Sequence, residues 1–145
     1  MKIRTFINFE LQNIKCIHTR LVRTKQQILD KIGLYMVASI TLNFDHQGRP
    51  EPWAPNAPAT LEQKTGNMIL YETGLLKAAT THEVQGNDVF IGPGGPAILY
   101  ARIQHLGGKA GPGHAVTIPA RPIYVVQDQD NIWIVQTVRE WVLNG

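Results

Sequence analysis

Residues 100–122 read YARIQHLGGKAGPGHAVTIPARP, a stretch that passes from helical spacing through glycines to a proline-bounded arginine. Apolar side chains recur every three or four positions over residues 97–106, which predicts a short helix. Gly107 follows where such a helix would end. The glycine-rich segment after it predicts a loop, and residues 116–118 are typical of a short strand. This stretch therefore predicts a helix, a glycine loop and a strand in close succession.

Arg121 stands between prolines in the segment Ile-Pro-Ala-Arg-Pro, residues 118–122. A residue that precedes proline is kept out of the helical region, so the backbone here is stiff and extended. A guanidinium presented from such a backbone can bind several carbonyl oxygens or a carboxylate. Two roles fit this arrangement. Arg121 is either an internal strut that fastens the segment to its own domain or a contact between subunits.

The first third of the chain predicts one long amphipathic helix. Residues 2–8 are β-branched and aromatic enough to predict a short strand before it, with Asn8 as the helix cap. The helix is expected to reach about Asn43. Gly33 interrupts the pattern and indicates either a kink or a close approach by another element. The apolar stripe consists of Leu11, Ile14, Ile17, Leu21, Ile28, Ile32 and Tyr35 or Met36.

Residues 44–60 predict an extended loop, because their prolines exclude a helix or a central strand. A loop of this length inside a compact domain is usually functional or covered by a partner. Trp53 is its only large anchor. Trp53 either pins the loop to the core of the same domain or is offered to a partner. The prolines are Pro50, Pro52, Pro55 and Pro58.

Two further elements follow from turn chemistry and spacing. Residues 77–84 and 89–91 look like strands, and the residues between them, QGND at 85–88, accept positive φ, so a β-hairpin is predicted. After the polar break at residues 127–131, a C-terminal helix is preferred, although residues 132–135 would also pass as a buried strand. One face of that helix would carry Ile132, Val135, Val138 or Arg139, and Val142.

The composition is that of an ordinary globular protein: 145 residues, 43% hydrophobic and 17% charged, with a net charge of +3. We therefore predict an α+β fold, with the long N-terminal helix packed on a small, mostly antiparallel β-sheet, a short helix and a C-terminal helix, in a single domain over residues 1–145. The N-terminus does not resemble a signal peptide, and no apolar run is long enough to cross a membrane. Folding in a cytoplasm and no membrane partner are the default expectations.

Basic residues gather near the N-terminus, where only Glu10 and Asp30 oppose them. They form either a solvated helix face or a surface turned toward DNA or an acidic neighbour. Cys16 is the only cysteine, which excludes an intrachain disulfide and a thiolate metal cluster; its spacing favours a small core side chain. The basic residues are Lys2, Arg4, Lys15, Arg20, Arg23, Lys25 and Lys31.

The motifs of enzymes and cofactor sites are missing from the sequence. Lys109 in the glycine loop is followed by Ala110 instead of the Ser or Thr of a phosphate-binding loop. The histidines show no metal-ligand spacing, and Ser39, the only serine, is not in a nucleophile elbow. We expect no catalytic residue, no cofactor and no metal. A small hydrolase built from His105, His114 and a carboxylate is the alternative, although the position of His105 before the glycine loop favours a role in orienting that loop by hydrogen bonding.

The order and spacing of short motifs along most of the chain resemble the phage virion morphogenesis family, the tail-completion proteins of Mu-like and related tailed phages. Each motif is weak alone, but together they are specific. They are Phe44, Gly48 and PWAP at 52–55; Lys64 and ILYETGL at 69–75; the hairpin; Tyr100-Ala101; Gly107-Gly108; and IPARP at 118–122.

The chain departs from the family pattern at three places. Residues 123–125 are Ile-Tyr-Val where the family usually continues with Phe-Leu-Gly, and residues 77–79 are Lys-Ala-Ala where many relatives have a serine. Residues 104–106 are Gln-His-Leu in place of His-Gln-Phe. These changes bear on which partner surface is kept.

The resemblance implies a structural protein of the virion tail or neck that is assembled in the host cytoplasm. It would complete the tail or join tail to head, as a homo-oligomeric ring, commonly six-fold in relatives at the head–tail junction, that contacts other phage head–tail or tail proteins. A ring needs two different patches on each subunit. The loops at 48–58 and 107–114 are the expected patches, with Trp53, Lys109, His114 and Arg121 as interface residues. A neck protein that contacts DNA through its basic N-terminal helix is the alternative.

Overall fold

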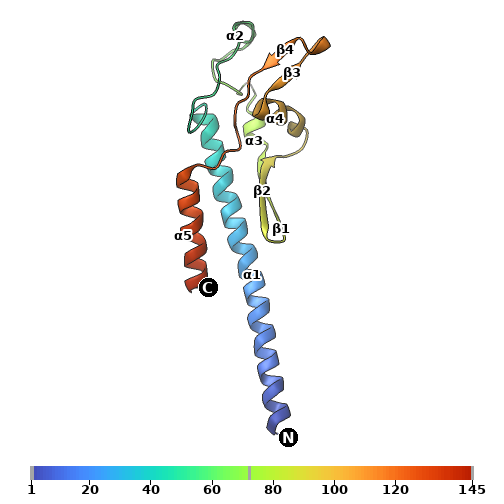
Figure 1. Cartoon of the computed structure of the whole chain (residues 1–145), viewed down its shortest axis with the longest axis vertical. Helices are drawn as coiled ribbons and strands as arrows, with labels where there is room; N and C mark the ends of the chain where they lie inside the picture. Colours follow the sequence, from blue (N-terminus) through green and yellow to red (C-terminus); the bar gives the residue numbers. More distant parts are fainter. Residues whose placement is uncertain (1, 72, 145) are drawn as a thin grey trace.

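The computed structural model describes the backbone of residues 2–71 and 73–144, and the side chains of residues 22, 24–71 and 73–144. The fold mixes helices with two small antiparallel sheets along one long helix (Figure 1). The elements are α1 (Lys2–Asp45), α2 (Pro58–Gln63), α3 (Leu75–Ala78), β1 (Thr80–Gln85), β2 (Asp88–Pro93), α4 (Ala97–Leu106), β3 (Gly108–Ala110), a 3₁₀ turn (Pro112–His114), β4 (Val116–Ile118) and α5 (Asp128–Asn144).

The elements are arranged around the C-terminal half of α1. The β1–β2 hairpin packs on one side of this helix and α5 lies on the other, while α2, α4 and the β3–β4 hairpin gather at its C-terminal end (Figure 1). The N-terminal part of α1 extends beyond both α5 and the β1–β2 hairpin. The molecule is therefore elongated.

The strand predicted at residues 2–8 is wrong, because α1 is helical from Lys2 and position 8 lies inside the helix. A lone strand would need a partner for its backbone N–H and C=O groups, whereas a continued helix satisfies these groups internally. The long helix itself is confirmed and ends at Asp45, while its predicted stripe residues Leu11, Ile14, Ile17 and Leu21 lie outside the described side chains. The prediction that Cys16 is a core side chain lies outside the described residues.

The β1–β2 hairpin is confirmed, with Gln85 paired to Asp88 across the two-residue turn Gly86-Asn87. Its first strand begins three residues later than predicted, because residues 75–78 form α3. Gly74, with φ 74°, adopts the left-handed conformation that starts this helical turn, and Leu76 is buried by it. The predicted short helix α4 and the C-terminal helix α5 are also confirmed.

The predicted loop at 44–60 is shorter than expected at both ends. Phe44 still belongs to α1, and Pro58 begins α2, where a missing N–H costs nothing in the first turn. In the glycine-rich segment, β3 was not predicted, yet it pairs antiparallel with β4 from Gly108 to Ala110. Its three residues, Gly-Lys-Ala, carry no strand pattern.

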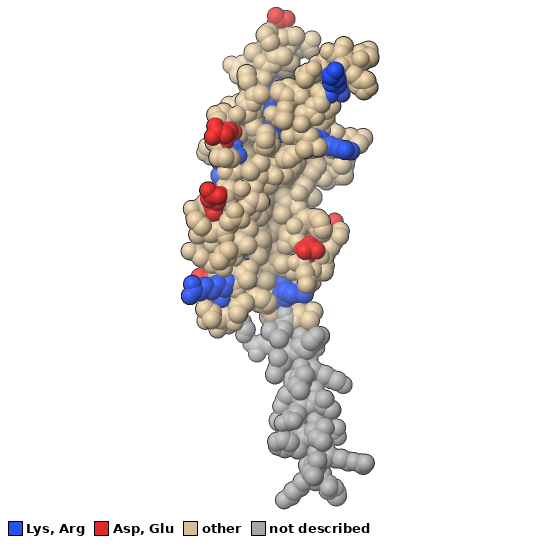
Figure 2. Space-filling view, viewed as in Figure 1, with Lys and Arg blue, Asp and Glu red and all other residues tan. Residues whose placement is uncertain are grey.

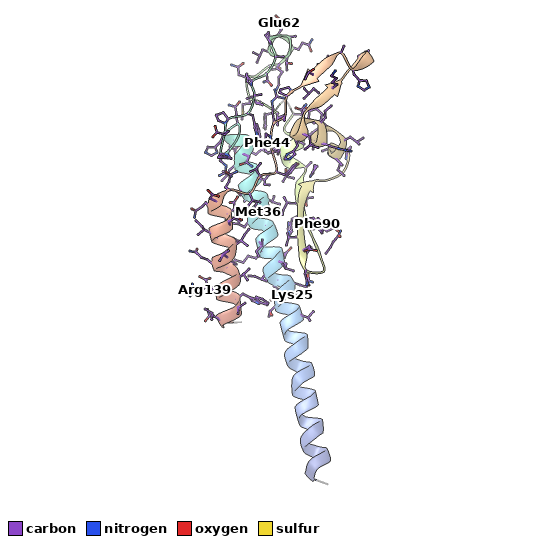
Figure 3. All side chains as sticks on the ribbon, viewed as in Figure 1. Lys25, Met36, Phe44, Glu62, Phe90 and Arg139 are labelled. Carbon is purple, nitrogen blue, oxygen red and sulfur yellow. The ribbon has the colours of Figure 1, made fainter. Side chains whose placement is uncertain are left out.

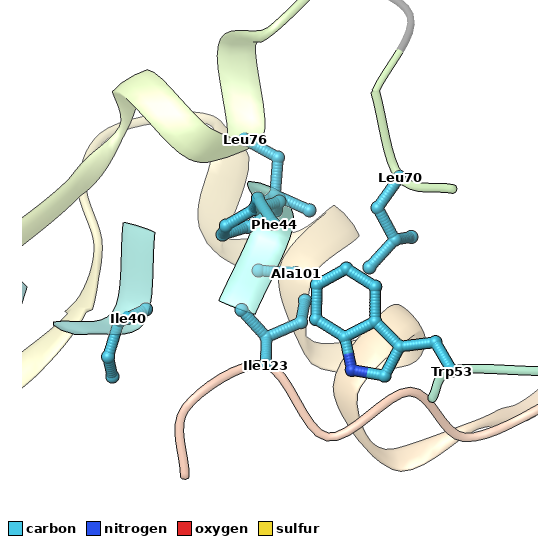
Figure 4. Packing of buried hydrophobic residues seen from close by; sticks show 7 residues of the cluster. All are labelled: Ile40, Phe44, Trp53, Leu70, Leu76, Ala101 and Ile123. Carbon is cyan, nitrogen blue, oxygen red and sulfur yellow. The ribbon is translucent and has the colours of Figure 1, made fainter. Parts of the chain in front are cut away.

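The hydrophobic core lies at the C-terminal end of α1 and joins segments far apart in the sequence. The Phe44 ring meets the Trp53 ring edge to face, with 5.5 Å between ring centroids. Figure 4 shows the Trp53 indole beside Ile123, which is fully buried. The core side chains are Ile40, Phe44, Trp53, Leu70, Leu76, Ala101 and Ile123.

The β1–β2 hairpin is fastened to α1 along its length. At the hairpin tip, Lys25 Nζ donates to Asn87 Oδ1 at 2.6 Å, and Figure 3 labels Lys25 at this level of α1. Further along, His82 Nε2 lies 2.7 Å from Asp30 Oδ1. The His82 ring covers Gly33 so closely that an added Cβ would clash with His82 Cδ2. Gly33 thus marks a close approach, the second of its two predicted roles.

Replacing Gly33 by alanine is expected to lower the free energy of unfolding by about 1–3 kcal/mol, because the new methyl group displaces the His82 ring. In a His82→Ala background the same change is expected to raise it by about 1 kcal/mol, the gain in helix propensity. Urea unfolding of the four chains measures both effects. Gly92→Ala, where an added Cβ meets open space, is the control. A destabilising effect in both backgrounds would show that His82 is not the obstacle.

Candidate interaction site around Arg121

Arg121 is buried, with 6% of its surface exposed, and its guanidinium ties three segments together. Nε donates to Ala54 O at 2.9 Å and Nη2 to Pro55 O at 2.9 Å, both in the proline-rich loop. Nη1 donates to Gln104 Oε1 of α4 at 3.1 Å. Of the two predicted roles, the structure shows the internal strut.

Trp53 also lies inside the fold, at 5% exposure. Its Nε1 donates to Pro122 O at 2.9 Å, so the residues beside Arg121 are bound by both the proline-rich loop and α4. Trp53 therefore pins its loop to the core of its own chain. Together, Trp53 and Arg121 fix the position of the proline-rich loop.

Lys109 and His114, the other two predicted interface residues, are exposed. Lys109 lies in β3, and His114 ends the 3₁₀ turn between β3 and β4 with φ 56°. The β3–β4 hairpin projects beside α2 at one end of the molecule (Figure 1). The structure therefore presents these two side chains to solvent, and their contact with a partner stays a prediction.

His105 orients a segment by hydrogen bonding, as the sequence predicted, but the segment is the one that follows Arg121. Its Nδ1 is 3.0 Å from the N–H nitrogen of Ile123 and 3.3 Å from that of Tyr124, so it accepts from both. Burial lowers the pKa of His105 below its ordinary value. The two hydrogen bonds and the burial both favour an unprotonated Nδ1, since protonation there would turn the acceptor into a donor.

An open apolar groove of about 700 Å³ lies beside the Arg121 strut. Its walls come from α2, the segment around α3, the start of α4 and β4, and Arg121 and Gln104 line it. Leu75, Tyr100 and Val116 line it as well and are each more than half exposed. The groove is of the size that holds a ligand or several inserted side chains.

The contact between α1 and α5 rests on a polar network that sequence reasoning missed. Asp130 Oδ2 accepts from Ser39 Oγ at 2.9 Å and from the Gln127 N–H at 2.9 Å, which caps α5. Arg49 Nη2 donates to Ser39 O at 2.6 Å, and Arg49 Nε donates to Asn43 Oδ1 at 2.8 Å. An acid three residues into a helix after a polar break is the one sequence signal that pointed to this cap.

The basic residues that the structure describes near the N-terminus contact their own chain. Lys25 is bonded to Asn87, and Lys31 Nζ lies 5.7 Å from the centroid of the Trp133 ring. Figure 2 shows Lys and Arg scattered singly over the described surface of one face, between Asp and Glu. The side chains of the other five predicted basic residues, Lys2, Arg4, Lys15, Arg20 and Arg23, lie outside the described set.

No group of three His, Cys, Asp or Glu side chains within the described part of the chain is placed to hold a metal ion. Within the same residues, no helix is both long and apolar enough to cross a membrane. His105 is engaged by backbone N–H groups, while His114 is on the exposed turn. The geometry described here is that of a braced loop beside a groove.

Comparison with known proteins assigns this chain to a family. Residues 9–143 match the phage virion morphogenesis family, so the chain belongs to that family of phage structural proteins, and the resemblance predicted from the motifs is confirmed. The chain is similar to the Mu-like prophage FluMu G protein 2 of Haemophilus influenzae (strain ATCC 51907 / DSM 11121 / KW20 / Rd). The two are 30% identical over 141 residues, which cover 93% of this chain and 95% of the relative. No solved structure matches the chain.

Replacing Arg121 by lysine is expected to lower the free energy of unfolding by about 2–4 kcal/mol, because a single ammonium cannot serve oxygens on two separate segments. Chemical denaturation measures this loss. Arg102→Lys, the same change at an exposed position of α4, is the control and should stay within about 0.5 kcal/mol of the native chain. Equal stability of the two variants would show that the strut contributes nothing.

The stability of the protein is expected to fall as the pH drops below about 6.5, the ordinary histidine pKa. In that range the unfolded chain binds a proton at His105 that the folded chain resists, because its folded pKa is lowered. Urea unfolding between pH 7.5 and pH 5 should show a shallower pH dependence for His105→Gln than for the native chain. His114→Gln, at an exposed position, should keep the native slope; the reverse pattern would rule out His105 as the source.

Proposed function

We propose that this protein completes the phage tail or joins the tail to the head during virion assembly, as a ring of identical subunits at the head–tail junction. The observation that carries the proposal is the family match over residues 9–143. The similarity to a Mu-like prophage protein along 95% of that protein's length supports it. The protein would be assembled in the host cytoplasm and would reside in the tail or neck of the particle.

The surface of the chain fits a protein that works by association. Large apolar side chains remain exposed on α4, on α5 and around the groove, including Leu99 at 83%, Leu75 at 70% and Val142 at 67%. Exposed apolar surface of this kind marks interaction sites. The partners proposed are other copies of this chain and other phage head–tail junction or tail proteins.

The rigid segment at residues 118–122 has a role in this proposal, because it fixes the loops that would contact a partner. Trp53 and Arg121 hold the proline-rich loop, and the β3–β4 hairpin presents Lys109 and His114 beside it. Because these surfaces are fixed before binding, little conformational entropy is lost on association. We favour this role over DNA contact through the N-terminal helix, because Lys25 and Lys31 are both occupied within the chain.

Deletion of the gene from its phage or prophage is expected to yield full heads beside unattached or incomplete tails in electron micrographs of lysates. Supplying the native chain from a plasmid should restore joined particles, which controls for effects on neighbouring genes. The defective part would identify the side that the protein completes. Normal, infectious particles from the deleted phage would overturn the proposal.

A further inference from the structure

Among the described residues that line it, the groove beside Arg121 has positive charge and no acidic side chain. Three of the five guanidinium N–H groups of Arg121 donate to neutral oxygens, and no carboxylate pairs with it among the described side chains. Lys64 lines the same groove, and its Nζ donates to a neutral oxygen, Met68 O. Asn56 Nδ2, also in the groove wall, is buried without a hydrogen-bond acceptor. An apolar groove with these unmatched donors favours an apolar segment that brings a carboxylate.

A face of α5 has the complementary character. The aliphatic side chains whose spacing predicted this helix point away from α1, which is contacted instead by Asp130 and Trp133. Trp133 stacks on Tyr35 with ring centroids 3.8 Å apart. Arg139 belongs to the same face, between Val135 and Val142, and lies on the outer side of α5 in Figure 3. The exposed aliphatic residues are Ile132 at 49%, Val135 at 66%, Val138 at 36% and Val142 at 67%.

Asp128 places a carboxylate at the head of this face. Positions 128, 132, 135 and 142 follow the spacing that keeps side chains on one side of a helix. Asp128 is exposed and makes no hydrogen bond or ion pair with the described residues. From Asp128 to Val142 the face is about 21 Å long, at 1.5 Å per residue. It is an aliphatic ridge that begins with the Asp128 carboxylate and carries the Arg139 guanidinium near its other end.

We infer that α5 of one subunit inserts its aliphatic face into the Arg121 groove of a neighbouring copy, with Asp128 facing Lys64 and Arg121. The inference rests on the proposed function, because it assigns the contact by which identical subunits would form the ring. The groove lies at the α2–α4 end of the molecule, whereas α5 lies lower along α1 (Figure 1). Because the ridge and the groove are apart within one chain, the inferred contact joins two chains.

This contact joins two different patches, so it repeats from subunit to subunit. A heterologous contact of this kind gives a ring where the rotation closes. The apolar side chains of the ridge supply burial, and the carboxylate supplies direction, because a reversed helix would place Arg139 toward Lys64 instead of Asp128. Charge thus fixes which end of α5 meets which end of the groove.

Cross-linking tests the contact directly. In a Cys16→Ser background that self-associates like the native chain, one variant carries Leu75→Cys at the groove and a second carries Val135→Cys on the ridge. A short bifunctional maleimide is expected to join the two variants only when they are mixed, and to yield a ladder of oligomers from a chain with both changes. Phe90→Cys, an exposed apolar position on the hairpin, replaces Leu75→Cys as the control.

Other outcomes of cross-linking would overturn the inference. Dimers from Val135→Cys alone would mean that α5 packs on α5, and equal joining with Phe90→Cys would mean that the contact is unspecific. A native chain that sediments as a monomer at all concentrations would leave the groove to another virion protein. Electron microscopy of the deleted phage tests the proposed role in tail completion or head–tail joining separately. Failure of this contact and failure of that role are therefore distinguishable.

A charge exchange tests the orientation. Asp128→Lys is expected to weaken self-association at least tenfold, measured by sedimentation, and Lys64→Asp in the same chain should restore much of it. Glu140→Lys makes the same charge change on the flank of α5, outside the ridge, and should leave association within about twofold of native, as expected for a rim charge. Equal losses from the two lysine variants, or no recovery in the double variant, would overturn the assigned pairing.

Discussion

The arrangement around the core depends on the hydrogen bonds that the Arg121 guanidinium donates. It binds two consecutive carbonyls of the proline-rich loop and the side chain of Gln104, so one cation sets the distance between the loop and α4. A loop with several prolines cannot join a sheet ladder, and its carbonyls need donors from elsewhere. Arg121 supplies these donors from a backbone held rigid by the prolines on either side. Burial lowers its pKa, yet a guanidinium remains charged in proteins.

The other contacts around Arg121 hold the residues that follow it in place. Trp53 fills the core against Phe44 and bonds to Pro122, the residue after Arg121. His105 then accepts the N–H groups of the next two residues. Aromatic packing and hydrogen bonds therefore fix four consecutive residues of an irregular segment. That segment crosses the end of α1 and leads to α5, so its position also determines where α5 begins.

Local patterns predicted the elements whose signals are local. The spacing of Leu99, Ile103 and Leu106 before Gly107 gave α4 with its observed bounds, and the turn residues gave the β1–β2 hairpin. The strand at residues 2–8 was wrong because β-branched residues also continue an established helix. The sequence alone left Arg121 with two roles, since its acceptors, Ala54 and Pro55, lie more than sixty positions earlier.

Longer-range features were beyond sequence reasoning for physical reasons. The bond from Ser39 to Asp130 joins residues 91 positions apart, and no periodicity reports such a pair. The spacing on α5 predicted a helix correctly but does not say which face meets α1. Polar and aromatic side chains, Asp130 and Trp133, make that contact, and the aliphatic residues are left outside.

The order of the core residues along the chain has a consequence for synthesis. Ile40 and Phe44 come early, but their fully buried neighbour Ile123 comes about eighty residues later, and Arg121 and β4 complete the groove wall only shortly before it. Contacts between such distant positions form late, after loop closure has been completed. A ribosome-bound or truncated chain that lacks these residues thus has neither the core nor the groove. Under the proposed function, a chain that stops before Arg121 would lack the groove by which subunits recognise one another and would not enter the assembly.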